Sequence, residues 1–361
     1  MKTQIDPWGN LEVKDYKKLM KELGVDDFEQ YSKKLKDTPL EIRRGLVVGH
    51  KDFHQIFNCM QKKQKFAILT GFMPSGPFHF GHMNLINQVI YYQSKGANIY
   101  LLAADLEAQL TRNKSLEETK KLAIEEYLLN WLALGLKTKN FDFYFQSEGS
   151  KEYMNLSKLA SAKTTFNEVK AIYGELSPQK LISALTQTAD ILKPQLEGFK
   201  TTLTPVGFDQ LPHANFSRDI AGRMNFNLPC FTFHKLLPGL QGVTTKMSSS
   251  RPETHISFND DEKTVKEKIM KYAFSGGQAT LQEHRKKGGN PDIDISFQWM
   301  KYIFEPNDKK LENIYNEYKS GSLLTGELKS ILIERINKLL KEHNKKKQQS
   351  RKYLNKILTK K

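Results

Sequence analysis

The stretch KFAILTGFMPSGPFHFGHMNLINQVIYYQSKG, residues 65–96, decides the fold of this 361-residue chain. It begins with a short apolar run, KFAILTGF, which stops near Gly71 and is typical of a strand buried on both faces of a parallel sheet. The loop MPSGPFHFGH follows, and then MNLINQVIYYQSKG carries apolar residues at helical spacing and ends at Gly96. The stretch therefore predicts a strand, a loop and a helix in direct succession.

The same alternation continues along the chain. ANIYLLAADLEAQL (97–110) predicts a second buried strand that runs into a loop or helix. The capping box Ser115-x-x-Glu118 opens a long helix, and FDFYFQSE (141–148) predicts a third strand. A β-α-β-α-β order implies a parallel sheet, in which ligands bind at the carboxyl ends of the strands.

Composition shifts divide the chain into three parts. Residues 1–65 form an N-terminal extension that is polar and mostly helical in pattern. Residues 66–258 contain the predicted sheet, with a helical insertion at about 110–200, and TTLTPVGFDQ (201–210) predicts a further strand there. Residues 259–361 are almost entirely helical in pattern and very basic. The expected fold class is α/β: a Rossmann-type parallel sheet followed by an all-α part.

The charge of the chain favours a polyanionic partner. The formal net charge is +16, and nucleic acid is the commonest partner of so basic a chain. The alternative is that the charge reflects a lysine-rich composition and no polyanionic partner. No apolar run of membrane-spanning length and no secretory leader are present, so we expect a cytoplasmic protein that does not bind a membrane. Cys59 and Cys230 stand far apart, which favours reduced thiols, and no Cys/His cluster indicates a metal site.

The loop PSGPFHFGH, residues 74–82, has the composition of a phosphate site. It lies between a predicted strand and a predicted helix, where backbone N–H groups and the positive helix end face an anion. Gly76 and Gly81 have no Cβ, so a ligand can approach the backbone closely. His79 and His82 are three residues apart and can both project from the first helical turn. A single histidine there is more often structural, but the whole loop favours phosphate binding.

A second stretch, KMSSS at 246–250, acquires meaning from the first. Alone it is typical of a flexible, solvated, serine-rich turn. Combined with the loop at 74–82, it predicts a mobile segment that closes over a bound triphosphate. Lys246 would neutralise charge that develops between the α- and β-phosphates, and such electrostatic stabilisation is typically worth several kcal/mol in a transition state.

The two segments together resemble the signature pair of class I aminoacyl-tRNA synthetases. His79-Phe80-Gly81-His82 stands where that family has HIGH, and KMSSS stands where it has KMSKS; the second position of one and the fourth of the other differ. LLAADLEAQLTR, LTQTADILKPQLE and PVGFDQLPHANFSRDIAGR resemble the tryptophan and tyrosine subclass. DPWG (6–9), FSGGQATLQEHRKKGGNPDIDISFQWMKYIFE and YKSGSLLTGELKSILIERI resemble the archaeal and eukaryotic tryptophan enzymes.

The resemblance implies a reaction and a set of site residues. The family adenylates its amino acid with ATP and Mg²⁺ and then transfers it to the 3′ end of tRNA. His79, His82 and Lys246 correspond to the catalytic residues. The implied ATP-binding residues are Ser75, Gly76, His79, Gly81, His82, Asp209, Lys246, Met247, Ser248 and Ser249. The implied tryptophan-binding residues are Gly71, Glu107, Gln187, Asp190 and Gln210.

The tryptophan pocket needs aromatic or aliphatic walls and one hydrogen-bond acceptor for the indole N–H. Gln187, Asp190 and Glu107 are each candidates for that acceptor, and Gln210 corresponds to the group that holds the substrate's ammonium. The chain departs from the eukaryotic pattern, because Leu69 and Leu102 stand where that branch has a tyrosine and a glutamine. The acceptor therefore stays open among the three candidates.

The resemblance also implies partners. These are tRNA(Trp), held at its anticodon by the basic helical part at 259–361, together with L-tryptophan, ATP and a second subunit in a homodimer. Three alternatives remain: a tyrosyl-tRNA synthetase, a small-molecule nucleotidyltransferase of the HIGH type, and an inactive RNA-binding paralogue. The long basic C-terminal part argues against the second, and the intact His79, His82 and Lys246 argue against the third.

Overall fold

A seven-stranded sheet lies at the centre of the computed structural model, which describes residues 5, 15–112, 114–249 and 251–359. Its strand order is β1-β2-β7-β6-β3-β4-β5. The strands are β1 (Asp26–Asp27), β2 (Val47–Lys51), β3 (Ala67–Phe72), β4 (Asn98–Ala103), β5 (Phe141–Phe145), β6 (Thr202–Gly207) and β7 (Cys230–His234). A separate hairpin consists of β8 (Pro238–Gly239) and β9 (Gly242–Lys246).

The five strands β3 to β7 are parallel, which confirms the expected fold class. The chain runs outward from β3 through β4 to β5 and then returns to place β6 on the other side of β3. The strand order therefore reverses between β3 and β6, and ligands in such sheets bind at this switch point. Both faces of β3 are buried: Phe66 and Ile68 pack into one cluster, and Ala67 and Leu69 into another.

The N-terminal extension contributes strands as well as helices. β2 pairs antiparallel with β7, and β1 pairs antiparallel with β2, so residues from the extension complete one edge of the sheet. The mostly helical pattern predicted for residues 1–65 missed these two strands: β2 pairs with β7, which lies almost two hundred residues further along the chain, and β1 is a strand only through its pairing with β2. The DPWG segment lies outside the described residues, as does Ser250 of KMSSS.

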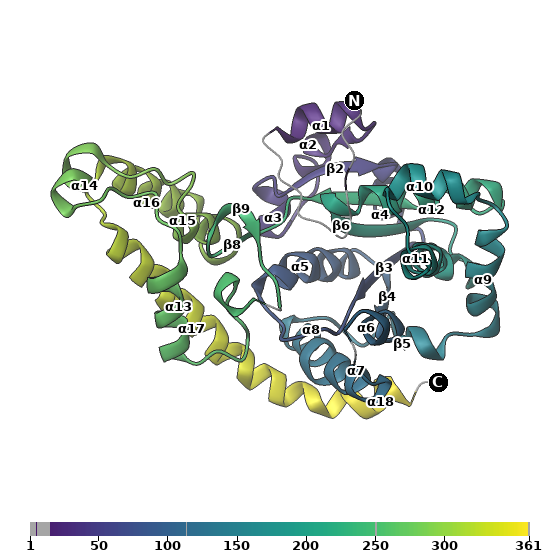
Figure 1. Cartoon of the computed structure of the whole chain (residues 1–361). Helices are drawn as coiled ribbons and strands as arrows, with labels where there is room; N and C mark the ends of the chain where they lie inside the picture. Colours follow the sequence, from purple (N-terminus) through teal and green to yellow (C-terminus); the bar gives the residue numbers. More distant parts are fainter. Residues whose placement is uncertain (1–4, 6–14, 113, 250, 360–361) are drawn as a thin grey trace.

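Helices cover both faces of the sheet (Figure 1). α5 and α8 pack on one face, and α1 and α11 pack on the other. The helices up to the end of the sheet region are α1 (Tyr16–Glu22), α2 (Glu29–Ser32), α3 (Leu40–Arg43), α4 (Phe53–Lys62), α5 (Phe80–Ser94), α6 (Asp105–Arg112), α7 (Leu116–Leu122), α8 (Leu129–Leu134), α9 (Lys151–Ser161), α10 (Phe166–Tyr173), α11 (Pro178–Leu196) and α12 (Leu211–Arg223). The helical insertion predicted at about 110–200 also contains β5, which pairs with β4.

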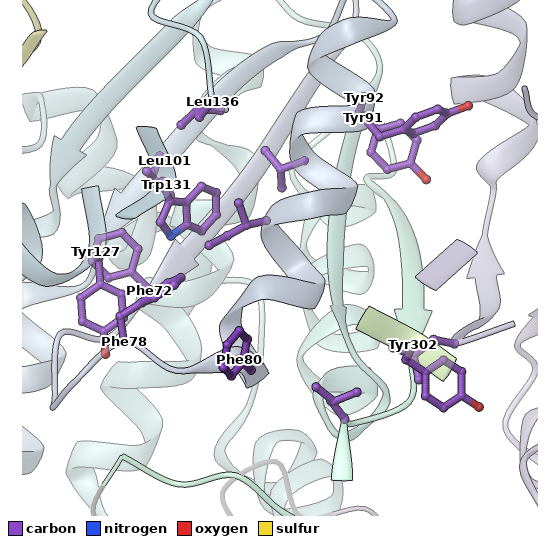
Figure 2. Packing of buried hydrophobic residues seen from close by; sticks show 14 of the residues in the cluster. Phe72, Phe78, Phe80, Tyr91, Tyr92, Leu101, Tyr127, Trp131, Leu136 and Tyr302 are labelled. Atoms are coloured by element: carbon purple, nitrogen blue, oxygen red, sulfur yellow. The ribbon is translucent and has the colours of Figure 1, made fainter. Parts of the chain in front are cut away.

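The helical stretch that begins with α7 changes from α-helical to π-helical hydrogen bonding before α8 begins. Between α7 and α8 the segment Ala123–Leu128 (η1) is a π-helical turn. Tyr127 in this turn stacks on Phe72 at the end of β3, with ring centroids 4.4 Å apart. Figure 2 shows Tyr127, Phe72 and Phe78 gathered at one end of the core cluster, with Trp131 beside Leu101. The π-helical turn thus packs against the end of the central strand.

The chain after residue 260 is helical, as the sequence predicted. Figure 1 shows α17 running from the α14–α16 group back along the sheet region to α7 and α8. The helices are α13 (Glu262–Tyr272), α14 (Leu281–Lys287), α15 (Ile295–Trp299), α16 (Asp308–Ser320), α17 (Thr325–Ser350) and α18 (Leu354–Leu358). Within the described part of the chain, no helix is both long and apolar enough to cross a bilayer.

Candidate active site

The site forms where β3 ends and α5 begins. His79 is the N-cap of α5, with an extended backbone (φ −135°, ψ 171°). Its Nδ1 accepts a hydrogen bond from the Gly81 backbone N–H at 3.1 Å, and the His82 Nδ1 accepts from the His79 N–H at 3.1 Å. A neutral imidazole that accepts at Nδ1 carries its proton on Nε2. Both rings are therefore set to donate through Nε2.

Burial keeps the two histidines neutral. It lowers the pKa of His79 well below its ordinary value, and the neighbouring His82 and His255 rings lower it further. Burial, followed by the His255 ring, lowers the pKa of His82 to about 4. The His79 and His82 rings are stacked with centroids 3.9 Å apart, and His255 lies 4.8 Å from His79. At neutral pH the pair acts as hydrogen-bond donors without positive charge.

The KMSSS segment lies directly against this loop. The Ser249 hydroxyl donates to the Pro77 carbonyl at 3.3 Å. A Cβ on Gly76 would come within 2.8 Å of the Ser249 Cβ, and a Cβ on Gly81 would come within 3.3 Å of the Met247 sulfur. These approaches explain physically why glycine stands at both positions. The two motifs, 170 residues apart in sequence, form one unit.

The two motifs share one cavity of about 330 Å³. All the implied ATP-binding residues except Gly76 and Asp209 line it. The lining residues are Ser75, His79, Gly81, His82, Arg112, Leu236, Leu237, Lys246, Met247, Ser248 and Ser249. A Cβ on Gly76 would meet Ser249, which is one of the lining residues. Asp209 is buried in the turn after β6, and burial raises its pKa, an effect that Gln210 and Lys246 oppose.

Two of the predicted tryptophan-binding residues belong to a buried polar network at the carboxyl end of β4. The Glu107 carboxylate accepts from the Ser183 hydroxyl at 2.8 Å, and the Glu107 N–H donates to Gln146 Oε1 at 3.3 Å. The Gln146 amide in turn donates to Asp190 Oδ2 at 3.2 Å, and the Tyr153 hydroxyl donates to Asp190 Oδ1. Glu107 and Asp190 are therefore linked through a single side chain.

Burial raises the pKa of both acids in this network. It raises the pKa of Asp190 to about 7, and Glu107 contributes in the same direction. Burial also raises the pKa of Glu107, against the hydrogen bond from Ser183. Two carboxyl groups that have lost water are strong acceptors for an N–H donor or a cation. The network therefore suits the indole N–H or the ammonium of an amino acid.

The other three predicted residues stand on β3, on α11 and directly after β6. Gly71 is the exposed residue of an otherwise buried β3, and a Cβ there would be in ordinary contact with Leu102. Gln187 is half-buried, one turn before Asp190 on α11. Gln210 donates to Asp209 at 3.3 Å, next to the end of β6. Leu69 and Leu102 pack in the same apolar cluster, so this side of the sheet is apolar beside Gly71.

Several site residues were missed in the sequence. Arg112, at the end of α6, adds a second cation to the cavity wall, and His255 packs on His79. Gln146 and Tyr153 complete the acidic network. None of the four carries a local signal of its own, and Gln146 lies inside the stretch 141–148 that was predicted to be a strand. Among the described residues, no three His, Cys, Asp or Glu side chains are grouped to hold a metal ion.

Comparison with known proteins identifies the family of the chain. The family described as tRNA synthetases class I (W and Y) matches residues 61–341. A tryptophan-tRNA ligase from Aeropyrum pernix is 40% identical over 351 residues, 94% of each chain, and one from Methanocaldococcus jannaschii is 40% identical over 366 residues, 98% of each. The crystal structure of the tryptophanyl-tRNA synthetase from Aeropyrum pernix K1 has a TM-score of 0.89 at 38% identity and covers 98% of both chains.

The chain therefore belongs to the class I tRNA synthetases of the tryptophan and tyrosine group. Its similarity to the relatives above extends over nearly its whole length. Within the group it belongs with the tryptophan-tRNA ligases, and these relatives give the tyrosine alternative no support.

Proposed function

We propose that this synthetase activates L-tryptophan with ATP, forming tryptophanyl-adenylate and pyrophosphate, and then transfers tryptophan to the 3′ end of tRNA(Trp). One observation carries the adenylation step: His79, His82 and Lys246 line a single cavity. Two neutral donors and one cation around the same space are what a triphosphate requires when it reacts. Mg²⁺ enters with ATP as part of the substrate.

In this reaction a carboxylate oxygen of tryptophan attacks the α-phosphorus of ATP, and the bond from that phosphorus to the α–β bridging oxygen breaks. The Nε2–H groups of His79 and His82 donate to phosphate oxygens, and Lys246 neutralises the charge of the departing pyrophosphate. Gly81 and Met247 contribute an apolar wall with room for the adenine and ribose. Asp209, near the end of β6, supplies an acceptor for ribose hydroxyls.

Tryptophan binds at the adjacent end of β3 and β4 in this proposal. The exposed Gly71, which has no side chain, and the apolar Leu102 side chain suit the flat indole. Glu107 and Asp190 supply the buried acceptors, and Gln210 faces the ammonium. Gln187 remains a further candidate for the indole N–H, and variants of these residues distinguish them by their effect on the KM for tryptophan.

The helical C-terminal part is the proposed anticodon-binding region. A cavity of about 400 Å³ lies between the 278–281 loop and the start of α17, with the exposed Leu281 in its wall. The buried His284 donates through Nε2 to the Leu323 carbonyl at 3.0 Å, which leaves its Nδ1 an acceptor without a partner among the described residues. The apolar part of this cavity wall suits an unstacked base.

A homodimer in the cytoplasm is the proposed state. Apolar side chains that are more than half exposed lie on α6, α9, α10 and α11: Leu110, Leu159, Phe166 and Ile182. The Gln179 amide donates to the Leu110 carbonyl, so α6 and α11 adjoin. Exposed apolar residues on adjoining helices favour a partner surface. Sedimentation should give a dimer that Ile182→Asp converts to monomer, whereas Leu281→Asp should not.

The test of the proposed activity is amino-acid-dependent exchange of pyrophosphate into ATP, with tryptophan, tyrosine and phenylalanine in parallel. Exchange with tryptophan alone supports the proposal. Exchange with tyrosine would assign the chain to the tyrosine alternative. The absence of exchange with all three would leave the inactive RNA-binding paralogue.

A further inference from the structure

Glu126 lies where three segments meet: the loop at 74–82, the segment that ends at Asn259, and helix α17. It belongs to the π-helical turn Ala123–Leu128. Such turns in otherwise regular helices occur frequently at functional sites. The next residue, Tyr127, stacks on Phe72 and meets the His82 ring edge-on at 5.4 Å. The turn thus places consecutive side chains against the end of β3 and the histidine loop.

The Glu126 carboxylate binds all three segments. Its Oε2 accepts from the backbone N–H of Phe78, the residue before His79, at 3.3 Å. The Asn259 amide donates to both carboxylate oxygens, at 3.0 and 2.9 Å. The Lys347 ammonium on α17 lies 3.9 Å from Oε1. The Glu126 side chain is only 18% exposed, and hydrogen bonds to a partly buried carboxylate are among the stronger ones in proteins.

The segment that ends at Asn259 is itself bonded to both motifs. The Phe258 N–H donates to the Phe78 carbonyl at 2.9 Å, and the Phe80 N–H donates to the Ile256 carbonyl at 3.4 Å. At its other end, the Thr254 hydroxyl oxygen accepts from the Ser248 N–H at 3.0 Å. Residues 254–259 therefore form a strap that connects KMSSS, the histidine loop and Glu126.

α17 reaches the same junction from the far side of the molecule. Its 26 residues span about 39 Å, and its first turn lines the cavity beside Leu281. Near its other end, His343 Nε2 lies 2.8 Å from Asn130 Oδ1, and the His343 ring meets Phe258 edge-on at 4.6 Å. The helix thus contacts the strap and α8, and its Lys347 reaches Glu126 in the π-helical turn.

We propose that Glu126 is a positioning residue for adenylation, which fixes the His79–His82 loop relative to the KMSSS strap and to α17. The inference rests on the proposed adenylation activity. Loss of the carboxylate charge weakens the anchor that the Phe78 N–H and Asn259 share, so the loop and the strap are held to each other mainly by their own backbone hydrogen bonds. The rate depends on their joint placement around the triphosphate, because displacements of about 1 Å at a reacting centre cost up to about a hundredfold.

The chain offers a matched control in the neighbouring Glu125. This residue pairs with Arg351, directly after the end of α17, at 2.5 Å, so its ion pair joins the π-helical turn to the C-terminal helices. Glu126→Gln and Glu125→Gln each remove one carboxylate charge from the same helical turn. A loss of helix docking alone would affect both variants alike.

The experiment measures tryptophan-dependent exchange, the KM for tryptophan and thermal unfolding for the wild type and both variants, normalised by active-site titration. Glu126→Gln should lower kcat for exchange by about tenfold or more, with the KM for tryptophan unchanged within about twofold. Transfer from preformed enzyme-bound adenylate to tRNA should stay near the wild-type rate, because pyrophosphate has already left. Glu125→Gln should match the wild type in both steps.

Three results separate the possibilities. A wild-type chain that lacks exchange contradicts the proposed function itself. An active wild type with equal kcat in Glu126→Gln, or equal losses in both variants, overturns the positioning role. Asn259→Ala provides a second measurement if Glu126→Gln does not fold: it removes the strap's donor while leaving the carboxylate in place, and it should lower kcat in the same selective way. An unchanged kcat in Asn259→Ala overturns the role as well.

Discussion

Replacing Gly76 with alanine should push the KMSSS segment away from the histidine loop, and the structure gives the size of this displacement. The new Cβ would lie 2.8 Å from the Ser249 Cβ and 3.4 Å from the Ser249 carbonyl oxygen. Carbon atoms in contact stay about 3.5–4.0 Å apart, so KMSSS must retreat from the histidine loop by about 1 Å. A displacement of this size costs about a hundredfold in rate, which corresponds to about 2.7 kcal/mol of activation free energy.

The assay for Gly76→Ala is tryptophan-dependent exchange, with tryptophan binding followed separately by fluorescence. We expect kcat to fall by about a hundredfold while the Kd for tryptophan stays unchanged, because Ser249, which the new Cβ would meet, lines the cavity proposed for ATP. The control is Gly326→Ala, whose new Cβ meets nothing within 4 Å. That variant should keep the wild-type rate.

A double variant tests whether the contact with Ser249 causes the loss of rate in Gly76→Ala. Ser249→Gly removes the carbon that a Cβ at position 76 would meet, so Gly76→Ala should cost much less in that background than in the wild type. Such non-additivity is expected of residues in contact. The interpretation fails if Gly76→Ala exchanges at the wild-type rate, or if it costs the same in both backgrounds.

Three further predictions address charge. Lys246→Ala should lower kcat for exchange by about a hundredfold or more with tryptophan binding unchanged, and an undiminished rate would contradict the role of KMSSS. Burial raises the pKa of Asp190 from 3.8 to about 7, so the folded state binds this proton more tightly than the unfolded state does. The free energy of unfolding should therefore fall as the pH rises from 3.8 to about 7, by at most about 1.4 kcal/mol per pH unit. Asp190→Asn should remove that slope in urea titrations, whereas an unaltered slope argues against it. With a net charge of +16, the KM for tRNA should rise about tenfold or more between 50 and 200 mM salt while exchange changes little.

Local patterns predicted the parts of the fold that local physics determines. The buried run before Gly71, the capping box at Ser115 and the helix after the histidine loop all appear where the sequence placed them. The strand β2 was missed because its pairing with β7 depends on a partner distant in sequence. The π-helical turn at Ala123–Leu128 was missed as well, since nothing in the helical pattern of 115–136 marks it.

In the candidate site, too, some residues are recognisable from the local sequence, whereas others depend on distant partners. The two motifs predicted to bind phosphate were recognisable because each is a compact run of unusual composition, and the structure places them around one cavity. Glu126, Gln146 and His255 are single polar residues in ordinary surroundings along the chain. Their significance comes from neighbours that only folding provides: the Phe78 N–H, Asp190 and His79. Residues of this kind require a structure to be found.

The central claim is that this chain joins tryptophan to tRNA through chemistry at Lys246 and the histidine pair. The most direct measurement is the charging of a tRNA(Trp) transcript with labelled tryptophan, beside labelled tyrosine with a tRNA(Tyr) transcript and beside the Lys246→Ala enzyme. We expect tryptophan on tRNA(Trp) only, and a loss of charging of about a hundredfold or more in the variant. Charging with tyrosine, or charging that survives the loss of Lys246, would contradict the account.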